Sequence, residues 1–142
     1  MTAAGPDDPG GVLAVSVGVA RDVEWAGRWW RTAIFKAPVP GAAWLRHDGV
    51  DGDEQANPRV HGGPDKAVYA YARTDLDWWR PLLGRPLDAG AFGENLTLAG
   101  VDPAGARVGE RWRVGGALLE VAGPRIPCAK LGLLRPFGCR VT

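Results

Sequence analysis

The sequence is poor in the residues that many enzymes use as nucleophiles or metal ligands. Its 142 residues include only two histidines, two cysteines and one serine. Ser16 lies within a strand-like apolar run without a nucleophile elbow, which disfavours a Ser-His-Asp hydrolase. His47, His61, Cys128 and Cys139 lack the close pairing that zinc sites use, so zinc has little support. Any site that uses histidine or cysteine therefore has very few candidates.

The sequence also lacks a long apolar run, a secretory signal and a strong net charge. Its most apolar stretch, residues 12–20, is far shorter than the roughly 20 residues that a membrane helix needs. Residues 1–11 are rich in Gly, Pro and Asp, with neither a basic start nor an apolar segment. The net charge of +1 gives no electrostatic reason to expect nucleic acid or a membrane as a partner. We therefore expect a soluble cytoplasmic protein.

Glycine and proline, in contrast, are abundant. The 21 glycines and 12 prolines disfavour long helices and favour short strands joined by turns. A chain of this length can form one sizeable core. The sequence predicts a flexible tail over 1–11 and a single domain over 12–142. We expect that domain to be mainly β (α+β) and barrel-like, with one or two short helices.

Residue patterns predict the individual elements. Strands are expected at four places: 12–20, 30–36, 66–72 and 91–98. A helix is expected over 74–80, with Thr74 as its N-cap and Pro81 limiting its end. The stretch 47–64 is turn-rich, and a long irregular segment of this kind is usually functional or mobile.

Residues 110–122 predict a β-hairpin. Two strand-like runs flank Gly115-Gly116, which suits a two-residue primed turn. This register pairs Trp112 with Leu119, an apolar pair, and Arg111 with Glu120, an ion pair.

Two polar segments could bind a ligand. In 61–66 (HGGPDK), the glycines allow backbone N–H groups to approach a ligand, Lys66 adds a cation and His61 can transfer a proton. In 93–97 (GENLT), Glu and Asn at a strand start can present polar groups. The residues alone are also compatible with an ordinary turn and an ordinary strand start, so both interpretations stay open.

A third segment, 123–130 (GPRIPCAK), places Cys128 on a stiff loop. Arg125 and Lys130 flank it, and nearby cations favour the thiolate, which is both a nucleophile and a soft-metal ligand. The alternatives are a buried inert thiol or a disulfide with Cys139, which reducing conditions in the cytoplasm disfavour. Reactive and inert interpretations remain open on these residues.

Six segments in this order resemble the MOSC domain family, named for the C-terminal domain of molybdenum cofactor sulfurases, and in particular its small YiiM-like branch. The resemblance covers about residues 14–134. The six segments are 32–39 (TAIFKAPV), 52–56 (GDEQA), 61–68 (HGGPDKAV), 92–97 (FGENLT), 108–112 (VGERW) and 124–131 (PRIPCAKL).

This resemblance implies a barrel-like β-rich fold and a molybdenum cofactor (molybdopterin). Cys128 matches the family cysteine that ligates the metal or carries sulfur, and His61 would deliver a proton. The residues implied in cofactor binding are Thr32, Lys36, His61, Lys66, Asn95 and Arg125. Members of this branch reduce N-hydroxylated compounds such as hydroxylamino-purines, with electrons from a separate reductase.

The resemblance also leaves two alternatives. Family domains usually continue beyond the cysteine loop into further strands, whereas this sequence stops at Thr142, so we expect those closing strands to be missing. The chain could then be a non-catalytic remnant. It could also be a sulfur carrier in which Cys128 accepts a persulfide from a separate pyridoxal-phosphate-dependent cysteine desulfurase.

Overall fold

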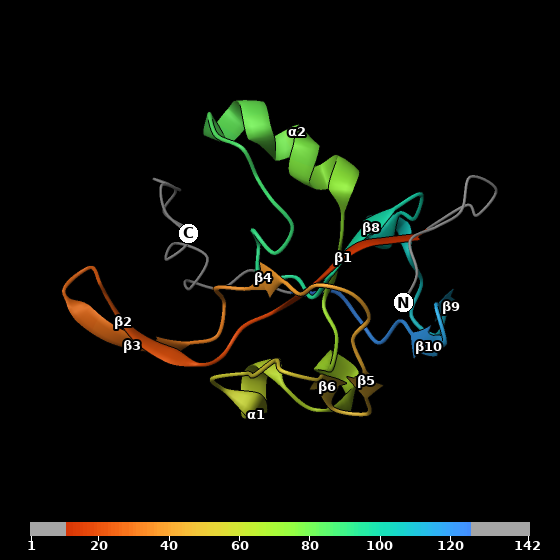
Figure 1. Ribbon diagram of the computed structural model, residues 1–142, viewed down its shortest axis with the longest axis horizontal. Helices are drawn as coiled ribbons and strands as arrows, with labels where there is room; N and C mark the ends of the chain where they lie inside the picture. The colour runs from red at the N-terminus through yellow and green to blue at the C-terminus, as the bar shows by residue number, and fades with distance from the viewer. Residues whose placement is uncertain (1–10, 126–142) are drawn as a thin grey trace.

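A four-stranded sheet lies at the centre of the molecule. The computed structural model describes residues 11–125. Strands β4 (Ala37–Pro38), β1 (Gly11–Val17), β8 (Leu96–Ala99) and β7 (Ala70–Ala72) lie side by side in that order (Figure 1). β1 is antiparallel to both of its neighbours, and β7 is parallel to β8. The sheet therefore joins segments that are far apart in the sequence.

Three hairpins surround this sheet. They are β2 (Arg21–Trp25) with β3 (Arg28–Thr32), β5 (Leu45–Arg46) with β6 (Gly49–Val50), and β9 (Arg111–Val114) with β10 (Ala117–Glu120). Each hairpin is a separate two-stranded sheet. The β2–β3 and β9–β10 hairpins lie on opposite sides of the central sheet (Figure 1).

The expected mainly β fold with short helices is confirmed, but its strands do not close into a barrel. The strands within residues 11–125 form one four-stranded sheet and three separate pairs. Most of these strands have two to five residues, and glycines or prolines interrupt the chain between them. Closure needs a continuous ring of paired strands, which such short elements do not supply.

The predicted β9–β10 hairpin is confirmed with its register. Trp112 pairs with Leu119, and Arg111 pairs with Glu120. The Arg111 Nε lies 3.2 Å from a carboxylate oxygen of Glu120. Gly115 has a φ of 57°, as the first position of a primed turn requires.

The other strands are shorter than predicted. β1 ends at Val17. The next residue, Gly18, lies so close to the backbone of Phe35 that a Cβ on Gly18 would be 2.6 Å from the carbonyl oxygen of Phe35. The segment expected as one strand over 30–36 is divided between β3 and the chain before β4. β7 begins only at Ala70, after the 3-10 turn η1 (Pro64–Lys66), and β8 begins only at Leu96.

The main helix, α2 (Arg73–Leu83), is longer than predicted at both ends. Its N-cap is Ala72 rather than Thr74, and Pro81 lies inside its last turn. The loss of one hydrogen bond at Pro81 is tolerated so near the end, where the N–H of Gly84 bonds the carbonyl of Arg80 at 2.9 Å. Gly84 has a φ of 64° and ends the helix.

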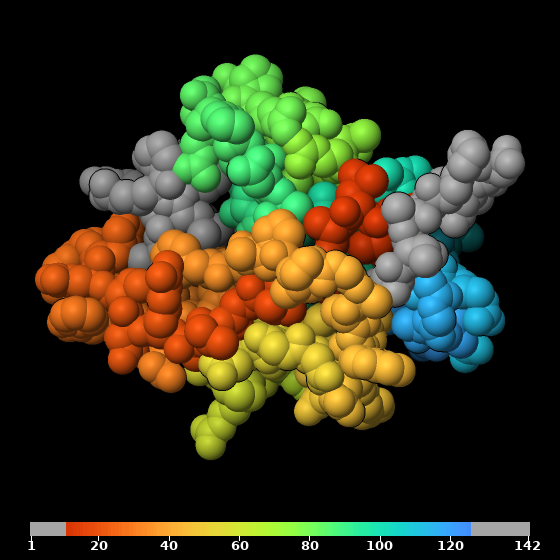
Figure 2. Space-filling view, viewed as in Figure 1, coloured from red at the N-terminus to blue at the C-terminus, as the bar shows by residue number. Residues whose placement is uncertain are grey.

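Two further short helical segments are α1 (Pro58–His61) and the 3-10 turn η2 (Pro103–Gly105). Figure 2 shows α2, in green, and the yellow segment that contains α1 on opposite sides of the central strands. Within residues 11–125, no helix is long and apolar enough to cross a bilayer.

The apolar core lies on the central sheet. It consists of Val12, Val15, Val50, Leu96 and Leu98. Trp112 and Leu119 of the β9–β10 hairpin pack against it, which anchors that hairpin. Full burial of each large aliphatic side chain contributes about 1.5–3 kcal/mol.

Several polar residues are as deeply buried as this core. They are Ser16, Thr32, Glu94, Asn95 and Thr97. Most of them lie where β1 ends and β8 begins. A buried polar group costs free energy unless it is hydrogen-bonded, so the hydrogen bonds of this region decide its stability.

Candidate functional site

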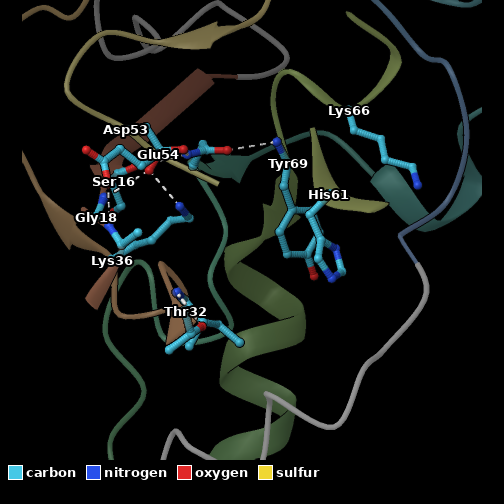
Figure 3. Close-up of polar contacts among 12 residues, drawn as sticks. Ser16, Gly18, Thr32, Lys36, Asp53, Glu54, His61, Lys66 and Tyr69 are labelled. Carbon is cyan, nitrogen blue, oxygen red and sulfur yellow. Dashed lines mark hydrogen bonds and ion pairs between the residues drawn. The ribbon is translucent and has the colours of Figure 1, made fainter. Parts of the chain in front are cut away.

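A buried ion pair occupies the region where β1 ends (Figure 3). Nζ of Lys36 lies 2.6 Å from Oδ1 of Asp53, and the two side chains are only 9% and 1% exposed. The Asp53 carboxylate also accepts the backbone N–H of Gly18 at 2.9 Å and Nδ2 of Asn95 at 2.9 Å. We call these four residues, together with Ser16, the Lys36 junction.

Asn95 connects this junction to β1 and to the chain before β7. Its Nδ2 also donates to the carbonyl oxygen of Ser16 at 3.1 Å, and its Oδ1 accepts the N–H of Tyr69 at 3.1 Å. Its backbone N–H bonds the carbonyl of Tyr69 at 2.8 Å, and its carbonyl accepts the N–H of Ser16 at 2.7 Å. The amide orientation of Asn95 is thus fixed by three intramolecular bonds.

A tight loop before β8 supports the junction. A Cβ at Gly90 would lie 2.6 Å from the carbonyl oxygen of Lys36, and Gly90 has a φ of 86°. Only glycine fits a position that combines a positive φ with this close approach. The loop therefore packs directly on the backbone that carries Lys36.

Glu94 holds this loop in place. Its carboxylate accepts the N–H of Gly90 at 2.6 Å, the N–H of Phe92 at 2.9 Å and the hydroxyl of Thr97 at 3.2 Å. Burial raises the pKa of Glu94 above its ordinary value, although these hydrogen bonds act in the opposite direction. We assign Glu94 a structural role, because its oxygens are directed at the loop itself.

A second group of polar residues surrounds Arg125, and we call it the Arg125 cluster. Nη2 of Arg125 donates to the carbonyl oxygen of Lys66 at 2.6 Å, and Nη1 lies 3.5 Å from that of His61. The guanidinium lies over the ring of Tyr69, 5.6 Å from its centre. Nζ of Lys66 donates to the carbonyl oxygen of Val60. Arg125 thus fixes the HGGPDK segment from both ends.

Burial shifts the pKa values of two members of this cluster. It lowers the pKa of Arg125 and raises that of Tyr69, because the charged form of each group is poorly solvated there. The negative charge of Asp53 acts on Arg125 in the opposite direction and raises its pKa. Arg125 remains a cation at neutral pH.

Tyr69 joins the two groups. Its backbone N–H and carbonyl bond Asn95 of the Lys36 junction, whereas its ring contacts Arg125. The two groups together contain three cations, a fixed amide and a histidine, brought together from four separated segments. Such a set can bind an oxygen-rich, anionic molecule.

The site residues predicted from the sequence lie in different parts of the structure. Lys36 and Asn95 lie in the junction, and His61, Lys66 and Arg125 lie in the cluster. Thr32 is buried at the end of β3, where its Oγ1 accepts the N–H of Ile34 at 3.2 Å. Cys128 lies outside the described residues. Within residues 11–125, His, Cys, Asp and Glu do not form a group of three or more that could hold a metal.

Asp53 is the residue that sequence reasoning missed. It belongs to the GDEQA segment, but the pattern does not reveal that its carboxylate is buried against Lys36. The available signal was an acidic residue next to a glycine inside one of the six family-like segments. That signal is weak, because acidic residues after glycine are common in exposed turns.

These features define a small, mainly β protein that gathers cationic and amide side chains around one buried carboxylate. The family model of the MOSC domain matches residues 57–134, more than half of the chain. The chain therefore belongs to the MOSC domain family, as its segments predict.

Comparison with curated proteins agrees with this assignment. The chain is 39% identical over 129 residues to the uncharacterized protein YflK of Bacillus subtilis (strain 168), covering 91% of this chain and 58% of YflK. It is 42% identical over 103 residues to protein YiiM of Escherichia coli (strain K12), covering 70% and 46%. It is 35% identical over 127 residues to a protein of Gibberella moniliformis (strain M3125 / FGSC 7600) named reductase, covering 87% and 22%.

The solved structures give the same relationship. The crystal structure of YiiM from Geobacillus stearothermophilus superimposes with a TM-score of 0.65 at 32% identity, covering 89% of this chain and 56% of that protein. The predicted resemblance to the YiiM-like branch is confirmed. The chain spans about half the length of the YiiM and YflK proteins that it matches.

Proposed function

We propose that this chain binds a molybdenum cofactor and reduces N-hydroxylated compounds such as hydroxylamino-purines or amidoximes. The observation that carries the proposal is the meeting of the Lys36 junction and the Arg125 cluster through Tyr69, in a member of the MOSC domain family. The relative named reductase supports the same reaction class.

The polar groups of the described site fit an oxygen-rich, anionic cofactor. An ammonium carries three N–H donors, and Asp53 accepts one from Lys36. Arg125 is held by two backbone carbonyls, which orient its guanidinium. Oγ of Ser16 is buried without a hydrogen-bond partner within residues 11–125. Lys36, Arg125 and Ser16 would therefore meet phosphate or pterin oxygens.

Other residues would act at the metal and the substrate. When bound, the cofactor supplies two-electron redox chemistry, for which Cys128 would provide a soft thiolate ligand. His61, a member of the Arg125 cluster, would donate a proton as the N–O bond breaks.

The overall reaction requires an external electron source. Cleavage of the N–O bond of a hydroxylamine consumes two electrons and two protons and yields the amine and water. The electrons would come from a separate reductase, as the family resemblance implies. The cofactor, the substrate and this donor are all parts of the proposal.

A reduction assay tests the proposal. The protein is expressed in a cofactor-competent host and supplied with a hydroxylamino-purine and a reduced viologen dye as electron donor. We expect formation of the aminopurine by the wild type and by Cys139→Ala, and at least a hundredfold loss for Cys128→Ala, the order expected when a group central to catalysis is removed.

The same variants separate the alternatives. Unchanged reduction by Cys128→Ala would contradict the proposed role of this cysteine. Addition of one sulfur to Cys128 after incubation with a cysteine desulfurase, detected by mass spectrometry in a protein without reductase activity, would instead favour the sulfur carrier.

A further inference from the structure

Asp53 was not among the residues predicted from the sequence, yet it makes three hydrogen bonds within the candidate site. Its three partners, Lys36, Gly18 and Asn95, lie 17, 35 and 42 positions away in the chain. Oδ1 accepts from the first two and Oδ2 accepts from Asn95. One carboxylate therefore joins the chain after β3, the end of β1 and the start of β8.

The burial of the Lys36 ammonium requires the carboxylate of Asp53. An ammonium that is only 9% exposed has lost most of its hydration, and such a charge is strongly unfavourable without a counter-charge. Asp53 supplies that charge at 2.6 Å. It follows that the position of Lys36 depends on Asp53.

Asn95 depends on the same carboxylate. Its Nδ2 is directed at Asp53 and at the carbonyl oxygen of Ser16, which leaves its Oδ1 directed at the N–H of Tyr69. Tyr69 in turn carries the ring that contacts Arg125. Asp53 is thereby linked to both groups of the site, although it is almost completely inaccessible to solvent.

We propose that Asp53 is the positioning residue of this site: it holds the Lys36 ammonium and the Asn95 amide in place before a ligand binds. This inference rests on the proposed function for the identity of the ligand, a molybdenum cofactor. Asp53 itself does not touch the ligand. It acts through Lys36 and Asn95, so that an anionic ligand meets donors that are already oriented.

The neighbouring carboxylate, Glu54, is a matched control. Its Oε2 accepts the N–H of Ala20 at 2.6 Å, just as Asp53 accepts the N–H of Gly18. Both side chains thus hold the same connection between β1 and β2. Glu54 is exposed, however, and the contacts to Lys36 and Asn95 belong to Asp53.

The test measures how fast acetic anhydride modifies Lys36, with exposed Lys66 as an internal reference, by mass spectrometry of peptides. In the folded wild type we expect Lys36 to react much more slowly than Lys66. In Asp53→Asn the rate of Lys36 relative to Lys66 should rise about tenfold, a factor that corresponds to loss of one charge-assisted hydrogen bond. Glu54→Gln should leave the ratio unchanged, and Asp53→Glu, which keeps the charge, should restore part of the protection.

Several outcomes would overturn the inference. Equal reactivity of Lys36 and Lys66 in the folded wild type would show that Lys36 is not held, and this measurement needs no variant to fold. An unchanged ratio in a folded Asp53→Asn protein would show that Asp53 does not hold it. A molybdenum content of Asp53→Asn equal to that of the wild type, despite increased labelling, would show that the positioning does not matter for the ligand.

Failure of the proposed function gives a different pattern. If the wild type contains no molybdenum, the cofactor proposal is wrong, whereas the labelling ratios still decide whether Asp53 positions Lys36. If the wild type and Glu54→Gln contain molybdenum and Asp53→Asn loses most of it with increased labelling, both proposals are supported.

Discussion

Two buried carboxylates illustrate how the surroundings decide the role of a residue. Asp53 faces the cation Lys36, whereas the oxygens of Glu94 accept two backbone N–H groups and the hydroxyl of Thr97. A cation places a full opposite charge beside a buried carboxylate, whereas neutral hydrogen-bond donors supply only partial charges. Asp53 is therefore suited to organise a charged site, and Glu94 to hold a loop.

This difference predicts an unusual pH dependence for Glu94. Because burial raises its pKa above 4.5, the folded state binds the proton more tightly than the unfolded state. The stabilisation associated with Glu94 is complete below pH 4.5 and is lost as the pH rises through the raised pKa. Urea unfolding of wild type and Glu94→Gln at a series of pH values should show the wild type losing stability relative to the variant over this interval.

Glu110 provides the control of opposite sign. Hydrogen bonds from the backbone of Arg107 and from the Trp112 ring lower the pKa of this exposed carboxyl group. The contribution of Glu110 to the stability of the folded state is present above pH 4.5 and is lost as the pH falls through the lowered pKa. For Glu94, the contradicting result is a difference in the free energy of unfolding between wild type and Glu94→Gln that does not change with pH. That result would show that Glu94 is not a charged group in a poorly solvated position.

Among the elements, those with local partners are the predictable ones. The β9–β10 hairpin pairs residues on either side of one turn, so the sequence pattern around that turn predicts both the strands and their register. The strand expected over 66–72 starts late, because Pro64 begins a 3-10 turn that alternation does not reveal. The end of β1 is set by the approach of Phe35 to Gly18, which depends on a distant part of the chain.

The turn of the β9–β10 hairpin allows a prediction with an internal control. Gly115 has a φ of 57°, a value that costs other residues about 1–2 kcal/mol, whereas a Cβ at Gly116 would meet nothing within 4 Å. Gly115→Ala should lower the free energy of unfolding by about 1 kcal/mol or more, and Gly116→Ala should change it by less than about 0.5 kcal/mol. Urea denaturation measures both, and equal effects would contradict the turn described here.

At the scale of the whole molecule, the site depends on contacts that the sequence pattern does not display. The six segments predict which stretches are important, and five of the seven predicted site residues lie in the Lys36 junction or the Arg125 cluster. Asp53 was missed because its function depends on partners 17 to 42 residues away. Sequence periodicity reports which face of an element is apolar, but not which buried charges meet.

The prediction of a barrel was also wrong at the scale of the whole molecule. Alternation correctly predicts many short strands, but closure depends on how the edge strands pair. Within residues 11–125, β4 and β7 are the edges of the central sheet, and the three hairpins pair only internally. Segments that are far apart in the sequence, from Ser16 to Arg125, build the candidate site.

The most direct test of the account is the molybdenum content of the purified protein, measured by inductively coupled plasma mass spectrometry after expression in a cofactor-competent host. We expect molybdenum in stoichiometric amounts in the wild type and in Cys139→Ala, and its loss from Cys128→Ala. A wild-type protein that is folded and contains no molybdenum, or a Cys128→Ala protein that retains all of it, would contradict the account.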